Sequence, residues 1–518
     1  MGIHFNDLQT ASLIQEKHSI TLADCARSLG RSVSSIKRSI SAVNEYLPPN
    51  KVILIENNCA VFQMSYQAYM DFIQSLSLDD YVPSQDERLD IMAVYGFLNP
   101  AINLSRLYDS LHISMSTKKK DSRALSQWLR EQGLMTQVIP KTGISIAGSE
   151  IRFRMCVCNI LHNYIEVDRD FNLTLRKANN PWQSMIAEYY IVKAQEDIQQ
   201  AKSLLQHLTG TFHYRISYTS VKFLYIYVSC SYFRLNAGHL LEVPVSLPVT
   251  VTAHHLLESP QEDEFLDQLI SSLDFTTRVL PPDDEQLLSI SLEMIRRVQK
   301  QILTWISDDH NVPEDVFAYL HKCIIRNAYH FSFYDNKLEE TRQQYNHLYD
   351  VVRKASIPFE QSYGITLSHF QTSTLTLIFR KYINRNKLRG RNQKRLVIVT
   401  NSSVEKVGFF MEKLKLQVDV LLAGIININE IYLVEQMEYD YLIVFSNRIA
   451  SMLAELDYPC LKLHFYLTKE DIELLFSLGF STSKRKIKTA YFIEEIRNMD
   501  KEQLKQYLLQ EYDDFFLE

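Results

Sequence analysis

Positively charged side chains gather at two places in this sequence, and each place also carries a run of hydroxyl residues. The first run reads RSVSSIKRSIS and the second reads SMSTKKKDSRA. Ammonium and guanidinium groups neutralise phosphates and bind base edges, and hydroxyls bind phosphate oxygens. The chemistry expected here is therefore nucleic-acid binding. The candidate contact residues are Ser34, Ser35, Lys37, Arg38, Ser116, Thr117, Lys119, Lys120 and Arg123, with Lys141 in a later turn.

Both basic runs lie in a repeated unit whose two copies are offset by 82 residues, as in Ser32 and Ser114. In the first copy Thr21 is a plausible cap for a short helix, which Gly30 ends. Ser32 or Ser34 then caps a second helix. Its predicted buried stripe is Ile36, Ile40, Val43 and Leu47. Two short helices joined by a tight turn indicate a helix-turn-helix, and the hairpin signal Asn57-Asn58 beyond it predicts a wing.

The second copy follows the same plan. A helix in ERLDIMAVYGFL precedes INLSRLYDSLH and STKKKDSRALSQWLREQG, and a hairpin turning at Pro140–Gly143 follows. The sequence therefore predicts two winged helix-turn-helix modules, at 1–75 and 84–160. Lys118 falls on Ile36 of the first copy, so either its stem lies along the core edge or the second helix begins later; both readings stay open.

The charge distribution favours DNA as the partner of these modules. The whole chain is acidic, with formal net charge −6, yet the second helix of each module is basic. Acidic residues lie instead in the connector SLSLDDYVPSQDERLD. A recognition helix meets phosphates and base edges in the major groove at this position, so we expect double-stranded promoter DNA as the partner. Pure protein-interaction modules with the same architecture remain the alternative.

Composition limits the class of protein. A chain of 518 residues is long enough for several domains, and it has no apolar stretch of about 18 residues that would span a membrane. The N-terminus lacks the pattern of a secretion signal. Cys156 and Cys158 are the one close pair among seven cysteines, without a second pair to complete a metal site. We expect a cytoplasmic protein with reduced thiols, no membrane partner, no metal, no cofactor and no catalytic residue.

The end of the second module carries a more specific pattern. Residues 143–150 read GISIAGSE, and Arg152 and Arg154 follow. This wing and its arginines resemble the second helix-turn-helix of bacterial regulators related to the sugar phosphotransferase system. Within that superfamily the two modules most resemble the Mga/AtxA group of virulence and carbohydrate-linked regulators. The resemblance implies two all-helical phosphotransferase-regulated domains (PRDs), which we place at 165–280 and 285–388.

The resemblance also implies regulation by phosphorylation. Segments 220–239 and 315–330 look like the opening helices of the two PRDs, where histidines accept phosphate from carrier proteins and shift dimerisation. His321 is the best-placed histidine in the second domain, and His207 is the alternative in the first. Phe379 stands where a later histidine would be sought. Implied partners are therefore phosphotransferase-system carrier proteins and a second copy of the chain.

Residues 392–490 change character. KRLVIVTNS is followed by an alternation of helices and apolar strands that indicates a small parallel sheet. This region is similar to the IIB domain of sugar phosphotransferase enzymes, in which a loop cysteine carries phosphate. Thr400 takes that place here, and a threonine without a base is a poor phosphoacceptor, so we expect a docking or dimerisation scaffold. Residues 491–518 are predicted to form a helical tail.

The sequence thus predicts a mainly α multidomain protein, with tandem winged helix-turn-helix modules, two PRD-like domains and an α/β IIB-like domain. Its expected function is that of a homodimeric DNA-binding transcription regulator, an activator, tuned by phosphorylation and dimerisation. An RNA-binding antiterminator of the same superfamily and a protein-interaction scaffold that binds no DNA are the alternatives. The missing cysteine argues against a phosphotransferase enzyme.

Overall fold

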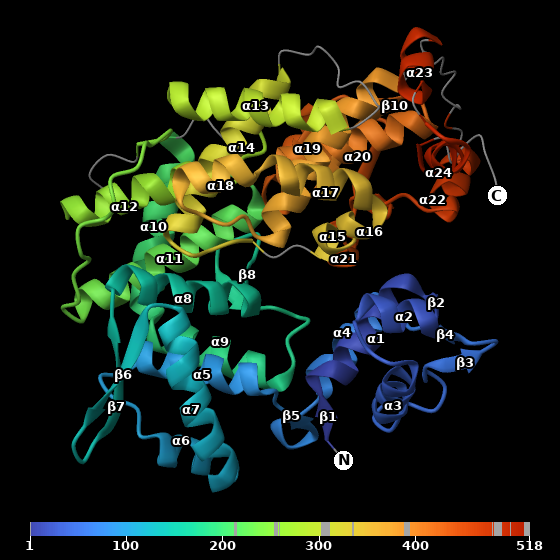
Figure 1. Cartoon of the computed structure of the whole chain (residues 1–518). Helices are drawn as coiled ribbons and strands as arrows, with labels where there is room; N and C mark the ends of the chain where they lie inside the picture. The colour runs from blue at the N-terminus through green and yellow to red at the C-terminus, as the bar shows by residue number, and fades with distance from the viewer. Residues whose placement is uncertain are drawn as a thin grey trace.

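The computed structural model describes residues 2–211, 215–252, 257, 259–301, 311–333, 336–387, 394–478, 480, 489–497 and 499–511. These residues are mainly helical, with small sheets near the N-terminus, in the middle and near the C-terminus. Figure 1 shows the N-terminal elements in blue and teal below a broad layer of green and yellow helices, with the orange sheet region beside that layer. Among the described residues, every helix is too short or too polar to cross a bilayer.

The first 75 residues form helices around a three-stranded sheet. The elements are β1 (Ile3–His4), α1 (Phe5–Lys17), β2 (Ser19–Thr21), α2 (Leu22–Ser28), α3 (Val33–Asn44), β3 (Leu54–Glu56), β4 (Cys59–Val61) and α4 (Tyr66–Ser75). Asn57 and Asn58 both have positive φ, at 48° and 62°, and connect β3 to β4 as the hairpin signal predicts. Ile36, Ile40 and Val43 of the predicted stripe are buried on α3, and Leu47, also buried, lies beyond the end of the helix.

A connector with η1 (Leu78–Asp80) and β5 (Tyr81–Val82) leads to a second set of three helices and a hairpin. The elements are α5 (Gln85–Leu98), α6 (Leu104–Ser110), α7 (Met115–Glu131), β6 (Leu134–Ile139) and β7 (Gly143–Gly148). β6 and β7 pair antiparallel along their full length. Ile102 adds a backbone bridge to Ile144, so the chain before α6 lies against the hairpin.

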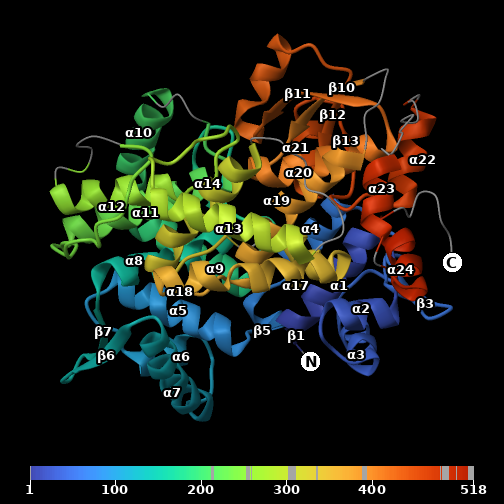
Figure 2. The ribbon, with the colours of Figure 1, turned by 45° about the horizontal axis from the view of Figure 1, so that its top comes forward.

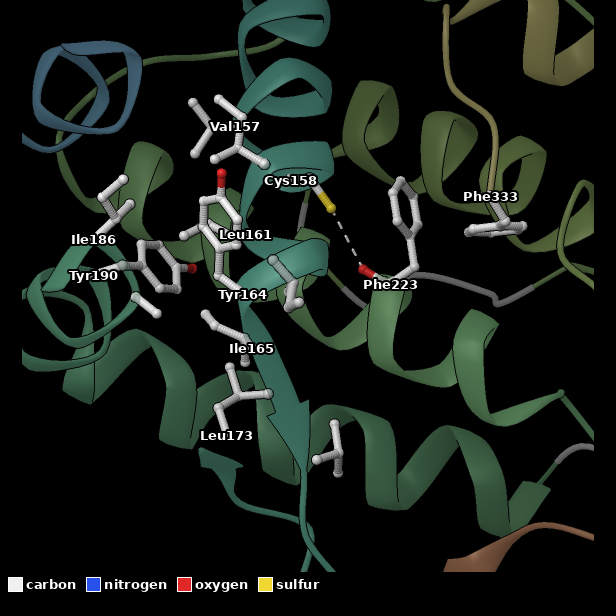
Figure 3. Packing of buried hydrophobic residues seen from close by; sticks show 14 of the residues in the cluster. Val157, Cys158, Leu161, Tyr164, Ile165, Leu173, Ile186, Tyr190, Phe223 and Phe333 are labelled. Atoms are coloured by element: carbon white, nitrogen blue, oxygen red, sulfur yellow. Dashed lines mark hydrogen bonds between the residues drawn. The ribbon is translucent and has the colours of Figure 1, made fainter. Parts of the chain in front are cut away.

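A helical region follows the hairpin. Its elements are α8 (Glu150–Tyr164), β8 (Ile165–Val167), β9 (Leu173–Leu175), α9 (Pro181–Lys193), α10 (Gln195–Thr211), α11 (Tyr218–Asn236) and α12 (Pro260–Ser271). Figure 3 shows its core, where the Sγ of Cys158 lies 3.6 Å from the carbonyl oxygen of Phe223. Segment 220–239 was expected to open this region, but α9 and α10 precede it. The β8–β9 hairpin was not expected, because strands of three residues are too short to show a period.

The next region is entirely helical within the described residues and has its own hydrophobic cluster. Its elements are α13 (Glu285–Gln301), α14 (Asn311–Ala328), α15 (Asn336–Glu339), α16 (Thr341–Gln344), α17 (Asn346–Ala355), α18 (Ile357–Tyr363) and α19 (His369–Lys387). Leu320, Val352 and Phe379 are fully buried in this cluster. Phe379 therefore has a structural role in the core.

The C-terminal region contains the parallel sheet that the sequence predicts. The strands are β10 (Lys394–Val399), β11 (Val420–Ile426), β12 (Tyr441–Val444) and β13 (Leu461–Lys462), in the order β11-β10-β12-β13. Every pairing between them is parallel. The other elements are α20 (Val404–Gln417), η2 (Ile428–Gln436), α21 (Asn447–Glu455), α22 (Lys469–Ser477), α23 (Thr489–Ile496) and α24 (Lys501–Glu511). The final residues of the predicted helical tail, 512–518, lie outside the described residues.

Distant parts of the chain meet around the first module. β1 pairs in parallel with β5, so the N-terminus is attached to the connector. α4 packs against α21 of the C-terminal region, where the Ser451 hydroxyl lies 3.4 Å from the side-chain oxygen of Gln67. Lys17 forms an ion pair of 3.5 Å with Glu340. The first module is therefore held by elements far away in sequence.

Candidate nucleic-acid interface

The repeated units share the hydrogen-bond geometry of their helix starts. Ser32 caps α3 by accepting the N–H of Ser35, and Ser114 caps α7 by accepting the N–H of Thr117. In each copy the capping hydroxyl also bonds two neighbouring hydroxyls, at 2.9 and 3.0 Å in the first and at 2.9 Å twice in the second. The same four-residue turn therefore starts both helices, and Ser32 rather than Ser34 is the cap.

The turn before each of these helices also repeats. Gly30 has φ of +61° after α2, and His112, which is 82 residues later, has φ of +54° after α6. A residue without Cβ adopts this left-handed conformation without strain, whereas histidine does so at a cost. The same backbone shape despite this change of residue indicates that the two helix pairs have the same geometry.

The candidate cations project into solvent. Lys37 and Arg38 on α3, and Lys119, Lys120 and Arg123 on α7, are all exposed. Their helices keep their apolar faces inward, since Ile36 and Leu125 are fully buried. The candidate hydroxyls lie in the first turn of each helix: Ser34 and Ser116 are exposed, and Ser35 and Thr117 are half-buried.

Lys118 differs from its two neighbours. Its side chain is half-buried, and its Nζ donates to the Ser105 hydroxyl on α6 at 2.5 Å. α7 begins at Met115, as α3 begins at Val33, so the second helix does not begin later than the first. Lys118 therefore takes the inward position that Ile36 occupies in α3, with its ammonium group at the edge of the core.

A buried ion pair fixes α7 against α5. Asp121 is completely buried, and its carboxylate lies 2.6 Å from the Nε of Arg88. The Tyr108 hydroxyl donates to the same carboxylate at 2.9 Å. A buried carboxylate with two such partners fixes the rotation of its helix about the helix axis. This rotation determines the direction in which Lys119, two residues earlier, projects from α7.

Both basic helices lie at the same side of the molecule. α3 and α7 are at the lower edge in Figure 1 and again in Figure 2, with the β6–β7 hairpin beyond α7. Lys141 is at the tip of that hairpin, exposed and with φ of +65°. The two helices and this tip together present cations to one side, which is an arrangement suited to an extended polyanion.

The motif at the end of the second hairpin has a structural role. Glu150 lies 2.9 Å from the Nε of Arg154 and 2.8 Å from the Nε of Arg234. Arg154 is fully buried, and its guanidinium also contacts Glu262 at 2.7 Å. This network connects α8 with α11 and α12. It couples the second module to the helical region and leaves Arg154 unavailable for an external anion.

The two candidate histidines differ in accessibility. His207 is exposed on α10, whereas His321 on α14 is only 3% exposed. The Nε2 of His321 lies 3.0 Å from the carbonyl oxygen of Pro248, so this nitrogen carries the hydrogen and donates. Burial lowers the pKa of His321 below its usual value. In this conformation His321 is covered by the segment that contains Pro248.

The loop after β10 is closed by its own hydrogen bonds. Thr400 is 1% exposed, and its hydroxyl accepts the N–H of Ser402 at 3.1 Å. We find no base beside it among the described residues that would activate the hydroxyl.

Sequence reasoning missed one charged cluster at the boundary between regions. Glu166 in β8 accepts from Arg448 of α21 at 2.7 Å, and Lys222 of α11 lies 3.6 Å away. These residues come from three separate segments, so spacing along the chain gives no sign of the cluster. Burial alone would raise the pKa of the Glu166 carboxyl. The surrounding cations lower it more strongly, so the pKa lies below its ordinary value.

Comparison with known proteins supports part of this picture. Residues 292–382 match the family model of the PRD domain. The chain is also 21% identical over 440 residues to the "Probable licABCH operon regulator" of Bacillus subtilis (strain 168), and the match covers 79% of this chain and 65% of that protein. The aligned part thus spans less than two thirds of that relative. The chain contains a PRD domain, and its similarity is to an operon regulator rather than to an enzyme.

Proposed function

We propose that this protein is a transcription regulator that binds double-stranded DNA through two winged helix-turn-helix modules, at 1–75 and 84–160. α3 and α7 are the recognition helices, and the β3–β4 and β6–β7 hairpins are the wings. Residues 165–280 and 285–388 are two PRD-like domains, and 392–490 is a IIB-like docking domain. An activator of the Mga/AtxA type, acting as a homodimer, is the finer assignment that we propose.

The observation that carries this proposal is the repeated start of α3 and α7. Each helix begins with the same triad of bonded hydroxyls, which is followed within six residues by exposed cations. Both helices face the same side of the molecule (Figure 1, Figure 2). Hydroxyls and helix starts bind phosphates, and cations that project from one face bind phosphates and base edges.

The test is a footprint and a titration on duplex DNA from upstream of the protein's own and neighbouring genes. Lys37→Ala with Arg38→Ala, and Lys119→Ala with Lys120→Ala, should each weaken binding. Each pair should also reduce the slope of log affinity against log salt by about two, since every lost phosphate contact removes about one unit. Arg296→Ala with Arg297→Ala is the matched control, because these adjacent exposed cations lie on α13, away from α3 and α7 (Figure 1).

Equal binding by the wild type and by both recognition-helix variants would show that these helices do not contact DNA. Loss of binding in the α13 control as well would indicate a general effect of net charge. The antiterminator alternative predicts binding to an RNA hairpin rather than to duplex DNA, and competition between the two separates these functions. Binding to neither at low salt would favour the protein-interaction scaffold.

We also propose that phosphotransferase-system carriers phosphorylate the helical domains, with His321 and His207 as candidates. The PRD match at 292–382 includes His321 and supports it as the first choice. Because Pro248 covers its Nε2, phosphorylation there requires the segment 239–252 to move away. Incubation with phosphoenolpyruvate and the general carriers, followed by peptide mapping, tests this point. Labelling that persists in His321→Ala and His207→Ala together would exclude both residues.

A further inference from the structure

A polar cavity of about 600 Å³ lies where four parts of the chain meet, one of them the segment 333–343. Residues of α1 and α4, of the helical region 150–280 and of the C-terminal sheet region all contribute to its wall. Its volume falls within the range of small-molecule sites in proteins. The function proposed above does not use this cavity.

Three helix N-termini converge on the cavity. α11, α20 and α21 begin there, and their N-cap residues Ser217, Ser403 and Ser446 line the wall. None of these three serine side chains makes a capping hydrogen bond. Backbone N–H groups at such ends, together with the helix dipoles, favour an anion.

Two of these serines are buried without a partner. Ser217 is 1% exposed and Ser403 is 3% exposed. Within the described part of the chain, neither side-chain hydroxyl has a hydrogen-bond partner. Both residues form part of the cavity wall, so a ligand oxygen in the cavity would supply the missing hydrogen-bond partner. This observation is independent of the helix dipoles and points to an occupant that accepts hydrogen bonds.

Cations exceed carboxylates at this end of the cavity. Glu166 is shared by three cations, since Arg448 lies 2.7 Å, Lys222 3.6 Å and Arg176 3.7 Å from its carboxylate oxygens. The pKa of Lys222 is lowered to about 8, mainly because its ammonium group is buried. The nearby arginines act in the same direction. Lys406 on α20 is another lining cation and is 7% exposed. A bound anion would offset this local excess of positive charge.

Four other carboxylates line the cavity, and two of them, Asp274 and Glu340, have ion-pair partners. Asp274 also lines the cavity, but Arg326 and Lys322 lie 2.9 and 3.4 Å from its Oδ1. Glu340, at another part of the wall, pairs with Lys17. Around the starts of α11, α20 and α21 the wall has four cations, Arg176, Lys222, Lys406 and Arg448, beside the two carboxylates of Glu166 and Asp274.

We propose that this cavity binds a small organic phosphate, with its phosphoryl group at the three helix N-termini and its organic part in the remaining polar space. Ser217 and Ser403 donate to the phosphoryl oxygens, and Lys222, Lys406 and Arg448 neutralise them. The ligand would connect the helical region to the C-terminal region beside the first module. An inorganic phosphate ion has the same headgroup chemistry but leaves most of the volume to water.

Calorimetric titration of the full-length protein tests the site with three probes: glucose 6-phosphate, glucose and inorganic phosphate. Binding of glucose 6-phosphate that is tighter than that of inorganic phosphate supports an organic phosphate. Equal binding of the two supports an anion site that takes the free ion. Absence of binding by both phosphates at millimolar concentration, or binding of glucose as tight as that of glucose 6-phosphate, overturns the proposal.

Variants locate the binding. Lys406→Met should weaken phosphate binding about tenfold or more, because it removes a buried cation from the headgroup. Lys413→Met is the control, since Lys413 lies on the same helix but does not line the cavity. Ser217→Ala with Ser403→Ala removes two hydroxyls without disturbing an ion pair and should weaken binding in a protein that remains folded. Affinity unchanged in this double variant and in Lys406→Met would overturn the site.

The test of phosphate binding in the cavity is independent of the test of DNA binding. The cavity variants leave α3 and α7 untouched, so a protein that binds duplex DNA but no phosphate refutes the cavity site alone. A protein that binds phosphate but no nucleic acid refutes the proposed function alone.

Discussion

Arg448 and Glu166 form an ion pair of 2.7 Å between α21 of the C-terminal region and β8 of the first helical region, 282 residues apart in sequence. The Tyr218 hydroxyl also donates to Glu166 at 2.6 Å, and the guanidinium of Arg448 lies 5.3 Å from the centre of the Tyr218 ring. Burial raises the pKa of Tyr218 above its ordinary value, so its hydroxyl stays neutral and continues to donate. The pair thus joins two regions through a hydrogen-bonded, largely buried contact.

Replacing Arg448 with methionine should loosen this junction. Glu166 would keep Lys222 but lose its shortest ion pair, at a cost of about 2 kcal/mol, below the 3–5 kcal/mol of a fully broken buried pair. Hydrogen exchange should become faster in both 165–167 and 447–455. Lys177→Met is the matched control, because Lys177 and Glu455 connect the same two regions at 3.7 Å but are exposed. Equal changes in both variants would mean that the burial of the Arg448 pair has no special importance.

Gly143 at the start of β7 should not tolerate a side chain. It has φ of +148°, and an added Cβ would lie 2.0 Å from the carbonyl oxygen of Ile102. Gly143→Ala should destabilise the second module by about 2–3 kcal/mol, through backbone strain and loss of the Ile102–Ile144 bridge. Local hydrogen exchange of 102–148 measures this effect.

Gly30→Ala provides the comparison for that variant. Gly30 also has positive φ, but no atom lies within 4 Å of the position that an added Cβ would take, so strain of about 1 kcal/mol is the whole expected cost. A larger effect at Gly30 than at Gly143 would contradict the role assigned to the contact with Ile102.

Asp90 should make stability depend on pH near neutrality. Burial raises the pKa of its carboxyl to about 7, while the Tyr164 hydroxyl, at 2.5 Å, acts in the opposite direction. A raised folded-state pKa gives stability that is present below the unfolded value near 4 and is lost as pH rises through 7. Asp90→Asn should therefore raise the thermal unfolding temperature at pH 8 more than at pH 5.

The exposed Asp79 in the connector supplies the control for this pH effect. Asp79→Asn should leave the difference between pH 5 and pH 8 as it is in the wild type. If Asp90→Asn also leaves it unchanged, then Asp90 is ionised in the folded protein at neutral pH and the burial argument fails.

Chemical modification should distinguish the two candidate histidines. Diethyl pyrocarbonate reacts with accessible neutral imidazole, so exposed His207 should be modified quickly and buried His321 slowly. Mass spectrometry of peptides taken at short times measures both rates in one sample. Equal rates would show that the segment around Pro248 leaves His321 in solution, and phosphorylation there would need no rearrangement.

The sequence predicted the structure best where residues close together in the chain determine a helix, a turn or a strand by themselves. The spacing of Ile36, Ile40 and Val43 predicted the buried face of α3, and Asn57-Asn58 predicted the turn between β3 and β4. The apolar run before Thr400 predicted a buried parallel strand. In each case propensity and periodicity within a dozen residues are sufficient, so no knowledge of distant partners is needed.

Other features depend on distant partners and could not be predicted. The pairing of β1 with β5 joins two-residue strands, which carry no periodic signal. The cover of His321 comes from Pro248, 73 positions earlier, and an apolar helix around a histidine is consistent with either a core or an exposed role. The inward direction of Lys118 depends on Ser105, although the alignment with Ile36 already limited it to two alternatives.

The contact between α4 and α21 has a consequence for synthesis of the chain. Gln67 and Ser451 are 384 positions apart, so the ribosome completes both basic helices long before it completes the support for the first one. N-terminal domains generally fold first during translation. A message truncated before α21 would therefore yield a product that keeps both sets of exposed cations but cannot fix their relative position. Under the DNA-binding function proposed above, such a fragment would compete for DNA. Loss of the final residues and loss of the whole protein would then have different effects in a cell.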